Sequence, residues 1–262
     1  MNIVLQMFRI LSVFCIVTIF VGFASVLHAK PSSEAVIEAP LVVVELFTSQ
    51  GCASCPPADA ILTELSQKDD ILALSYFVDY WNYLGWEDTF AGKDCTIRQK
   101  KYSRALGKSG VYTPQMIVQG TSDIVGSRGK QIHEMVGSTR QKIALTAKDA
   151  PRITFDPMGD MIDLKVSAGK PSGSRPKNAT IWIIGYDYEK SVDIKWGEQG
   201  GNVRHYRNVV QSIKRIGSWM GEEIKLTLSK KDIGAVPYDA YAVILQEDET
   251  GPIVAAAKLT LK

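Results

Sequence analysis

The sequence has few of the residues that bind transition metals. It contains four cysteines and three histidines in 262 residues. Beyond the apolar N-terminal segment, the remaining ones are Cys52, Cys55, Cys95, His133 and His205. Structural zinc sites need four cysteine or histidine ligands at characteristic spacings, so a Cys₄ or Cys₂His₂ site would require distant residues to combine. A metal centre is therefore the weaker interpretation, and we predict no metal site and no bound cofactor.

A strong charge of either sign is also absent. Thirty Lys and Arg residues stand against 28 Asp and Glu residues, which gives a net charge of +2. Such a balance does not create the basic field that nucleic acids or acidic membrane surfaces attract, so we predict neither as a partner. The composition, 45% hydrophobic and 22% charged, is typical of a globular protein with one large or two modest domains.

The N-terminus differs from the rest of the chain. Residues 10–27 form a nearly unbroken apolar run, preceded by Arg9 and containing no acidic residue. We predict a secretory signal peptide over residues 1–29, with cleavage after Ala24 or Ala29. An uncleaved single-helix anchor is the alternative, because the run is nearly long enough to span a bilayer. Both predict a periplasmic or secreted protein, in a compartment where disulfides persist.

Two apolar strand patterns enclose a helix pattern near the start of the mature chain. Residues 41–47 and 71–78 are continuous apolar runs, as in strands buried on both faces. Between them, at about 56–68, apolar residues recur every three or four positions after two prolines, which favours a helix. A strand, a helix and a strand this close together predict a right-handed βαβ unit with parallel pairing.

Three further elements complete this region. We expect a helix at 94–106, a hairpin with strands 116–119 and 123–125, and an amphipathic helix at 129–148. The resulting order, β-α-β-α-β-β-α, is that of thioredoxin. We therefore predict an α/β thioredoxin-like domain over residues 38–149.

The character of the sequence changes after Ala150. Residues 152–262 carry repeated short strand patterns, and clusters of Gly, Pro, Asp and Ser separate them. Strands at this spacing without a clear helix are typical of antiparallel β-sandwiches. We therefore predict an all-β, sandwich-like second domain over residues 152–262.

The segment TSQGCASCPPAD places two cysteines between the first strand and the first helix. A thiolate is the attacking species in disulfide exchange, and a helix N-terminus stabilises it through partial positive charge and free N–H groups. Cys52, just ahead of the helix, is the candidate nucleophile with an exposed sulfur, and Cys55 is placed to resolve the mixed disulfide. An inert structural disulfide and half of a zinc site are the alternatives for this spacing.

A second motif, Val-Tyr-Thr-Pro, ends just before the predicted strand at 116–119. In a thioredoxin-like fold a cis proline precedes this strand and packs against the active-site disulfide, so we predict a cis bond between Thr113 and Pro114. We expect both residues in the catalytic site, with Pro114 positioning the substrate backbone. Tyr112 is a candidate substrate-binding residue. In another fold, Pro114 would be an ordinary trans proline that begins a strand.

Glu45 is the only ionisable residue in the first apolar strand. If it is buried, its pKa would be raised and it could exchange protons with Cys55. If it lies at the end of the strand, it would reach solvent instead.

An aromatic loop, DYWNYLGW, follows the second strand at the carboxyl edge where sites form in parallel sheets. Tyr80 and Trp81 are the candidate substrate-binding residues of this loop. The alternative is that the aromatic residues cover the core or contact the second domain. Cys95 shares an apolar helix face, so we expect a buried free thiol there.

Several stretches together carry a resemblance to a known family. They are VVELFTSQGCASCPPAD, VDYWNYLGWEDTF, RQKKYSRALG, VYTPQMIVQG and GEQGGNVRHYRNVVQSIKRIGSW. With them the chain resembles a family of secreted bacterial thioredoxin-like proteins known as a domain of unknown function. The resemblance implies that the family's cysteine pair falls on Cys52 and Cys55 and its Thr-Pro on Thr113 and Pro114. It suggests Glu45 for the buried acid of the wider superfamily, one residue farther from the cysteines.

These observations predict a periplasmic or secreted thiol–disulfide oxidoreductase that acts on protein thiols or disulfides, or on a redox partner protein. Electrons would come from the other protein's dithiol or disulfide. Two alternatives stay open. The chain could be a thioredoxin-scaffold binding module with an inert disulfide, or a copper-handling protein, because soft thiolates favour Cu(I).

Overall fold

The computed structural model describes residues 40–170, 178–233 and 238–259. The predicted signal peptide at residues 1–29 lies outside the described residues. Within the described part of the chain, none of the helices combines the length and apolarity needed to cross a bilayer.

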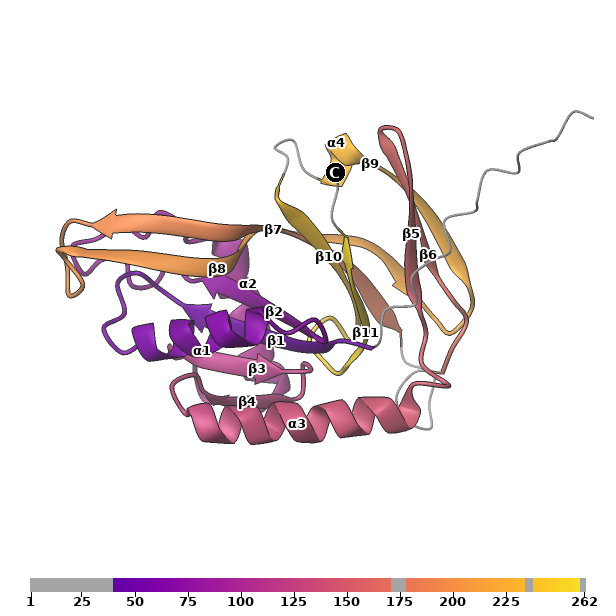
Figure 1. Cartoon of the computed structure of the whole chain (residues 1–262), viewed down its shortest axis with the longest axis horizontal. Coiled ribbons are helices and arrows are strands. Elements are labelled where there is room, and N and C mark those ends of the chain that lie inside the picture. The colour runs from indigo at the N-terminus through magenta and orange to yellow at the C-terminus, as the bar shows by residue number, and fades with distance from the viewer. Residues whose placement is uncertain (1–39, 171–177, 234–237, 260–262) are drawn as a thin grey trace, which may run out of the picture. The chain divides into compact units, whose positions relative to one another are not determined.

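The first region has the predicted order of elements (Figure 1). They are β1 (Val42–Thr48), α1 (Pro56–Ser66), β2 (Ile71–Phe77), α2 (Lys93–Ala105), β3 (Gln115–Val118), β4 (Ser122–Val125) and α3 (Gly129–Thr146). Strands β1 and β2 are buried along their whole length and pair in parallel, as their apolar sequences predict. Strand β3 pairs antiparallel with the other edge of β1 and continues into β4, which confirms the predicted hairpin.

The second region consists almost entirely of strands. They are β5 (Ile153–Met158), β6 (Met161–Val166), β7 (Ala179–Ile194), β8 (Asn202–Trp219), β9 (Ile224–Ser229), β10 (Ala240–Glu247) and β11 (Ile253–Leu259), with the single-turn α4 (Lys230–Ile233) after β9. Strands β5, β6 and β9 form a three-stranded antiparallel sheet. The other four strands belong to a different, larger sheet.

This larger sheet joins both regions of the chain. Its eight strands run in the order β11-β10-β7-β8-β2-β1-β3-β4. Strand β8 lies parallel to β2 where Ser75 faces Val209. Two side chains support this junction, because the Ser75 hydroxyl donates to Arg207 O at 2.8 Å and the Asn208 amide donates to Ala73 O at 2.7 Å. The structure is therefore a mixed α/β fold, and a free-standing β-sandwich after residue 150 is not what it shows.

The hydrophobic cores show the same continuity. One face of the sheet packs against α1 and α3 through residues such as Val44, Leu62 and Ile132. The core on the other face combines residues of the first region with residues of β7, β8 and β10, for example Phe47 with Ile184. A third core fills the space between the two sheets. The described residues fall in one compact unit, and the predicted division into 38–149 and 152–262 stays a prediction.

Strands β7 and β8 are unusually long, with 16 and 18 residues where five or six are usual. Their outer half continues beyond the β10 pairing and lies along the first region (Figure 1). There Tyr206 packs between Phe77 and Phe90, with ring centroids at 4.9 and 6.0 Å. This small aromatic cluster fixes the outer half of the hairpin against β2 and the loop after it.

Candidate functional site

Cys52 and Cys55 form a disulfide at the start of α1. Their Cα atoms are 5.4 Å apart. Cys55 is the N-cap residue of α1, and Cys55 N donates to Cys52 O at 3.2 Å, which closes a tight turn ahead of the helix. The pair therefore lies where the sequence predicts it, between a buried strand and a helix.

The sequence predicts free backbone N–H groups at the start of α1, and the structure has none in its first four positions. Pro56 and Pro57 fill its first two positions and have no N–H. The next two amides, of Ala58 and Asp59, both donate to Cys55 O at 2.8 and 3.1 Å. The helix thus offers its dipole to a thiolate, but its first-turn amides are absent or already used. The Ser54 hydroxyl is a polar group within hydrogen-bond distance of the sulfur, because its Oγ lies 3.5 Å from Cys52 Sγ.

The expectation of an exposed nucleophile is wrong for this structure. Cys52 has only 2% of its surface exposed and Cys55 has none. The residues between them, Ala53 and Ser54, are exposed. Side chains from distant parts of the chain also contact this loop, and such contacts leave no pattern in the sequence around the cysteines.

One of these contacts comes from the tip of the β7–β8 hairpin. The side-chain amide of Gln199 donates to Gln50 O at 3.0 Å and to Cys52 O at 2.8 Å. Its Oε1 accepts a hydrogen bond from Arg204 Nε at 3.0 Å. Gln199 is itself 4% exposed. A residue 147 positions after Cys52 therefore lies directly on the cysteine loop.

The loop is also fixed from the aromatic segment. Gln50, which is fully buried, receives a hydrogen bond from Trp86 Nε1 at 2.7 Å on its Oε1 and donates from Nε2 to the Thr89 hydroxyl at 3.1 Å. The backbone N–H of Gln50 donates to the Asp88 carboxylate at 2.7 Å. Burial raises the pKa of Asp88, and the hydrogen bonds that the backbone N–H groups of Gln50 and Phe90 donate to it oppose the rise. The segment before the cysteines is thus rigidly held.

Asp59 is the carboxyl group nearest in sequence to the resolving cysteine on the helix. It lies four residues after Cys55, and such pairs share one face of a helix. The Thr48 hydroxyl donates to Asp59 Oδ1 at 2.8 Å. Burial raises the pKa of Asp59 to about 7, while the Thr48 hydrogen bond and the positive charge of Arg204 oppose the rise. Asp59 can therefore both give and take a proton near neutral pH.

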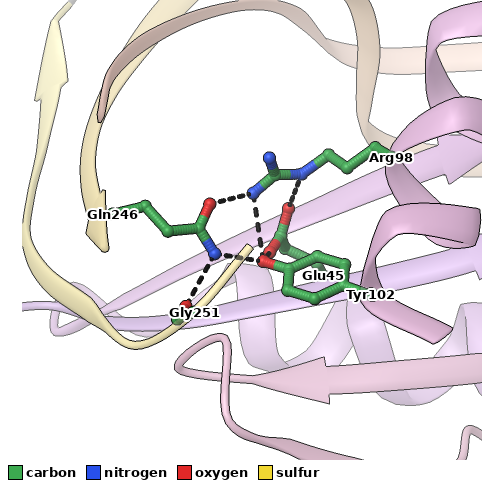
Figure 2. A network of polar contacts seen from close by, with 5 residues as sticks. All are labelled: Glu45, Arg98, Tyr102, Gln246 and Gly251. Carbon is green, nitrogen blue, oxygen red and sulfur yellow. Dashed lines mark hydrogen bonds and ion pairs between the residues drawn. The ribbon is translucent and has the colours of Figure 1, made fainter. Parts of the chain in front are cut away.

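Glu45 is buried, as one of the two alternatives predicted, but it is paired. Arg98 Nε donates to its Oε1 at 2.7 Å, and the Tyr102 hydroxyl donates to its other oxygen (Figure 2). Burial alone would lower the pKa of Arg98, but the Glu45 carboxylate raises it well above its ordinary value. Arg98 Nη2 continues to the Gln246 side chain of β10 at 2.9 Å.

This network gives Glu45 a structural task. Gln246 also donates to the Tyr102 oxygen at 2.8 Å and to Gly251 O at 2.9 Å, so the network ties β1, α2 and β10 together (Figure 2). Breaking such a buried ion pair by removing one partner would leave the other charge uncompensated. A proton exchange between Glu45 and Cys55 stays a prediction, and the hydrogen bonds of Glu45 described above are with Arg98 and Tyr102.

The Thr113–Pro114 peptide bond is cis, which confirms the predicted isomer. Thr113 accepts a hydrogen bond from Trp81 Nε1 at 2.8 Å. A Cβ added at Gly51 would lie 3.2 Å from Trp81 Cβ, so Trp81 contacts the cysteine loop as well as Thr113. The structure thus brings three of the predicted site segments together around this tryptophan.

The other predicted substrate-binding residues are only partly available. Tyr80 and Tyr112 are half-buried, and the Tyr112 hydroxyl donates to Asp123 at 2.9 Å. In the aromatic loop the most exposed side chain is Tyr83, which the sequence analysis did not select. Cys95 is a buried free thiol, as expected, and burial raises its pKa to about 12.

A cavity of about 160 Å³ lies elsewhere, beside α2. Arg98, Trp182 and Ile213 are among the residues that line it, and neither disulfide cysteine does. The disulfide, the Thr113–Pro114 segment and Trp81 of the aromatic loop instead come together at the cysteine loop, so we place the candidate site there.

Sequence reasoning missed Asp59, Gln50 and Gln199. Asp59 had a usable signal, because its position four residues after Cys55 puts it on the same helix face. Gln199 had none of this kind, since a glutamine in a turn between two strands is ordinary. Its role depends on a contact across 147 residues of sequence.

The comparisons with known proteins agree with this architecture. The model of the family described as "Protein of unknown function (DUF1223)" matches residues 43–246. A crystal structure of a protein from Agrobacterium tumefaciens is 35% identical, with a TM-score of 0.72, over 85% of this chain and 95% of the other. HBP35 of Porphyromonas gingivalis has a TM-score of 0.52 over 85% of this chain and 75% of its own, and at 12% identity this shows the fold alone.

The search among curated proteins gave no match. The family match covers well over half of the 262 residues and includes the cysteine loop, the Thr-Pro segment and the hairpin tip. This chain therefore belongs to the family of proteins of unknown function DUF1223.

Proposed function

We propose that this protein is a thiol–disulfide oxidoreductase of the periplasm or the extracellular space. The observation that carries the proposal is the Cys52–Cys55 disulfide at the N-terminus of α1, at the end of a buried parallel strand. Support comes from the β-α-β-α-β-β-α order, which we interpret as thioredoxin-like, and from Thr113, which Trp81 links to the cysteine loop. The proposed partners are protein thiols and disulfides.

The proposed reaction exchanges disulfides in two steps. When the protein oxidises a substrate, a substrate thiolate attacks Cys52 Sγ and the Cys52–Cys55 bond breaks. Cys55 leaves with the electron pair as a thiolate. A second substrate thiolate then attacks the substrate sulfur of the mixed disulfide and releases Cys52. The substrate loses two electrons and two protons, and the cysteine pair gains them; the reverse sequence reduces a substrate.

Asp59 is the proposed proton donor for the leaving Cys55 thiolate. A group that exchanges protons near neutral pH is most effective when its pKa is close to 7, as burial makes the pKa of Asp59. It shares the helix face of Cys55, and Asp59 N already donates to Cys55 O. The ion pair with Arg98 leaves Glu45 less suited to this task.

The test is to trap the mixed disulfide. In Cys55→Ala the Cys52 thiolate can attack a substrate disulfide, but nothing resolves the product, so covalent adducts should accumulate in extracts of secreted or periplasmic proteins. They should run as larger species on non-reducing gels and disappear with dithiothreitol. Cys52→Ala/Cys55→Ala is the matched control and should form none. Equal adducts in both variants, or none in either, would remove the enzymatic proposal.

The burial of Cys52 favours a second candidate, a binding module with an inert disulfide. Such a module would keep its disulfide in excess dithiothreitol and form no adducts with Cys55→Ala. An enzyme would be reduced under the same conditions and would form them. Thiol titration of the wild-type protein after incubation with dithiothreitol separates the two.

A further inference from the structure

The tip of the β7–β8 hairpin, residues 195–201, occupies a position that an oxidoreductase would leave open. Gln199 in this tip reaches the main chain of the cysteine loop and donates to the carbonyl oxygens of Gln50 and Cys52 at 3.0 and 2.8 Å. Those are main-chain acceptors directly beside the candidate nucleophile. Cys52 is 2% exposed under this arrangement.

The tip is shaped to lie there. Gly197 has a φ of +78°, a conformation that favours glycine. A Cβ at this position would meet Leu84 O at 3.1 Å and Trp86 Cβ at 3.2 Å, so only a glycine lets the tip approach the aromatic loop this closely. Beside it, the rings of Trp86 and Trp196 have centroids 6.3 Å apart. The tip therefore contacts the aromatic loop through Trp196 and Gly197, and the cysteine loop through Gln199.

The amide of Gln199 is held in place from its other end. Arg204 Nε donates to Gln199 Oε1 at 3.0 Å, which fixes the orientation of the amide and aims its NH₂ group at the two carbonyls. Arg204 also lies close enough to Asp59 to oppose the rise of its pKa. The polar contacts that connect the tip with the cysteine loop thus converge on one side chain.

From this geometry we propose that Gln199 is a positioning residue that holds the hairpin tip as a lid over the Cys52–Cys55 disulfide. The inference rests on the proposed function and extends it to how substrates reach the site. Reaction requires the two hydrogen bonds from Gln199 to break. Lifting the tip exposes Cys52 and frees the carbonyls of Gln50 and Cys52. These carbonyls become acceptors for main-chain N–H groups, so the substrate class is an extended polypeptide.

The lid is tested by the rate at which dithiothreitol reduces the disulfide, with two electrons and two protons passing from the reagent to the cysteine pair. Gln199→Ala removes the latch, and Gln199→Glu keeps its shape but removes the NH₂ donor. Two lost hydrogen bonds correspond to about a 30-fold rise in the open population, and we expect the second-order rate to rise by about that factor in both variants. Glu198→Ala, an exposed neighbour in the same tip, is the matched control and should behave like wild type.

Hydrogen exchange supplies a second readout, in which residues 195–201 should exchange faster in both Gln199 variants. If a Gln199 variant does not fold, Arg204→Met, which removes the donor to Gln199 Oε1, should raise both the reduction rate and the exchange rate. Rates within twofold of wild type in the folded variants, or an equal rise in Glu198→Ala, would overturn the proposal.

Reduction by dithiothreitol needs no protein substrate. The lid can thus fail while Cys55→Ala still traps a partner, and it can hold when no partner is trapped.

Discussion

Asp59 and Glu45 are both acidic side chains of the first region, yet their surroundings give them different chemistry. Glu45 lies opposite a buried guanidinium and accepts hydrogen bonds from Arg98 and Tyr102. Asp59 has a hydroxyl as its hydrogen-bond donor, and burial dominates its titration. The positive charge of Arg204 opposes the rise of the Asp59 pKa but does not cancel it, so Asp59 is the better candidate for a proton carrier near neutral pH.

The raised pKa of Asp59 makes a prediction about stability. Because its folded pKa of about 7 lies above the ordinary value of 3.8, the folded state binds this proton more tightly than the unfolded state. The stability that this tighter proton binding gives the folded state is fully present below about pH 4 and is lost as the pH rises towards 7. Asp59→Asn keeps an acceptor for Thr48 and should remove this slope, so its free energy of unfolding relative to wild type should rise between pH 5 and pH 8 by roughly 2 kcal/mol, after a discount for partial exposure.

Urea unfolding of both proteins at the two pH values measures this difference. Asp69→Asn, at an exposed aspartate near the end of α1, is the matched control and should show no such change. A difference between Asp59→Asn and wild type that stays constant with pH would contradict the assignment.

The β7–β8 hairpin connects the two regions of the chain, and its tip contacts the cysteine loop. Its inner half pairs with β10, where it belongs to the core between the two sheets. Its outer half lies beyond the β10 pairing and is held by the cluster of Tyr206, Phe77 and Phe90, by the short junction with β2 at Ser75, and by the contacts of the tip. Because backbone pairing to the first region is confined to that junction, the arm should open more readily than the sheet behind it.

Tyr206→Ala tests how the arm is held. The change removes a buried ring that packs edge to face against Phe77, and an aromatic-to-alanine change in a core costs about 3–5 kcal/mol. We expect faster hydrogen exchange across residues 187–209, with the inner half of the hairpin less affected. His205→Ala changes an exposed neighbour and should leave exchange as in wild type. Uniform acceleration throughout the protein would show that the arm does not open separately.

In the whole molecule, the first region depends on strands that come later in the chain. Strand β8 lies beside β2, and residues of β7 and β10 fill the core over Phe47. Gln246 of β10 completes the hydrogen bonds of Arg98. Without these partners, one edge of the sheet and a buried ion pair would face water.

A chain that ends at residue 150 should therefore fail to fold cooperatively. We expect it to keep helical far-ultraviolet circular dichroism but to lose its near-ultraviolet signal and bind a hydrophobic dye, as partly packed states do. The chain of residues 38–262 is the control and should unfold in one cooperative transition. A shortened chain with native near-ultraviolet dichroism and a cooperative transition would instead establish the predicted domain at 38–149.

Residue patterns alone predicted the elements of the first region and the position of its cysteine pair. Apolar runs and the prolines after Cys55 located β1, α1 and β2, because these signals depend on neighbours within a few residues. The same local logic placed the cysteine pair at the start of a helix and Pro114 before a strand.

Tertiary structure alone decided which groups surround the disulfide. Gln199 reaches the Cys52 carbonyl from 147 residues away in sequence, and Glu45 pairs with Arg98 from 53 residues away. Gln246, a further 148 residues along the chain, completes the hydrogen bonds of Arg98. Strand patterns do not state which strands become neighbours, so the joined sheet and the covering hairpin followed only from the packed chain. The raised pKa of Asp59 and the low exposure of Cys52 were likewise decided by the tertiary structure, because both depend on which groups pack nearby in space.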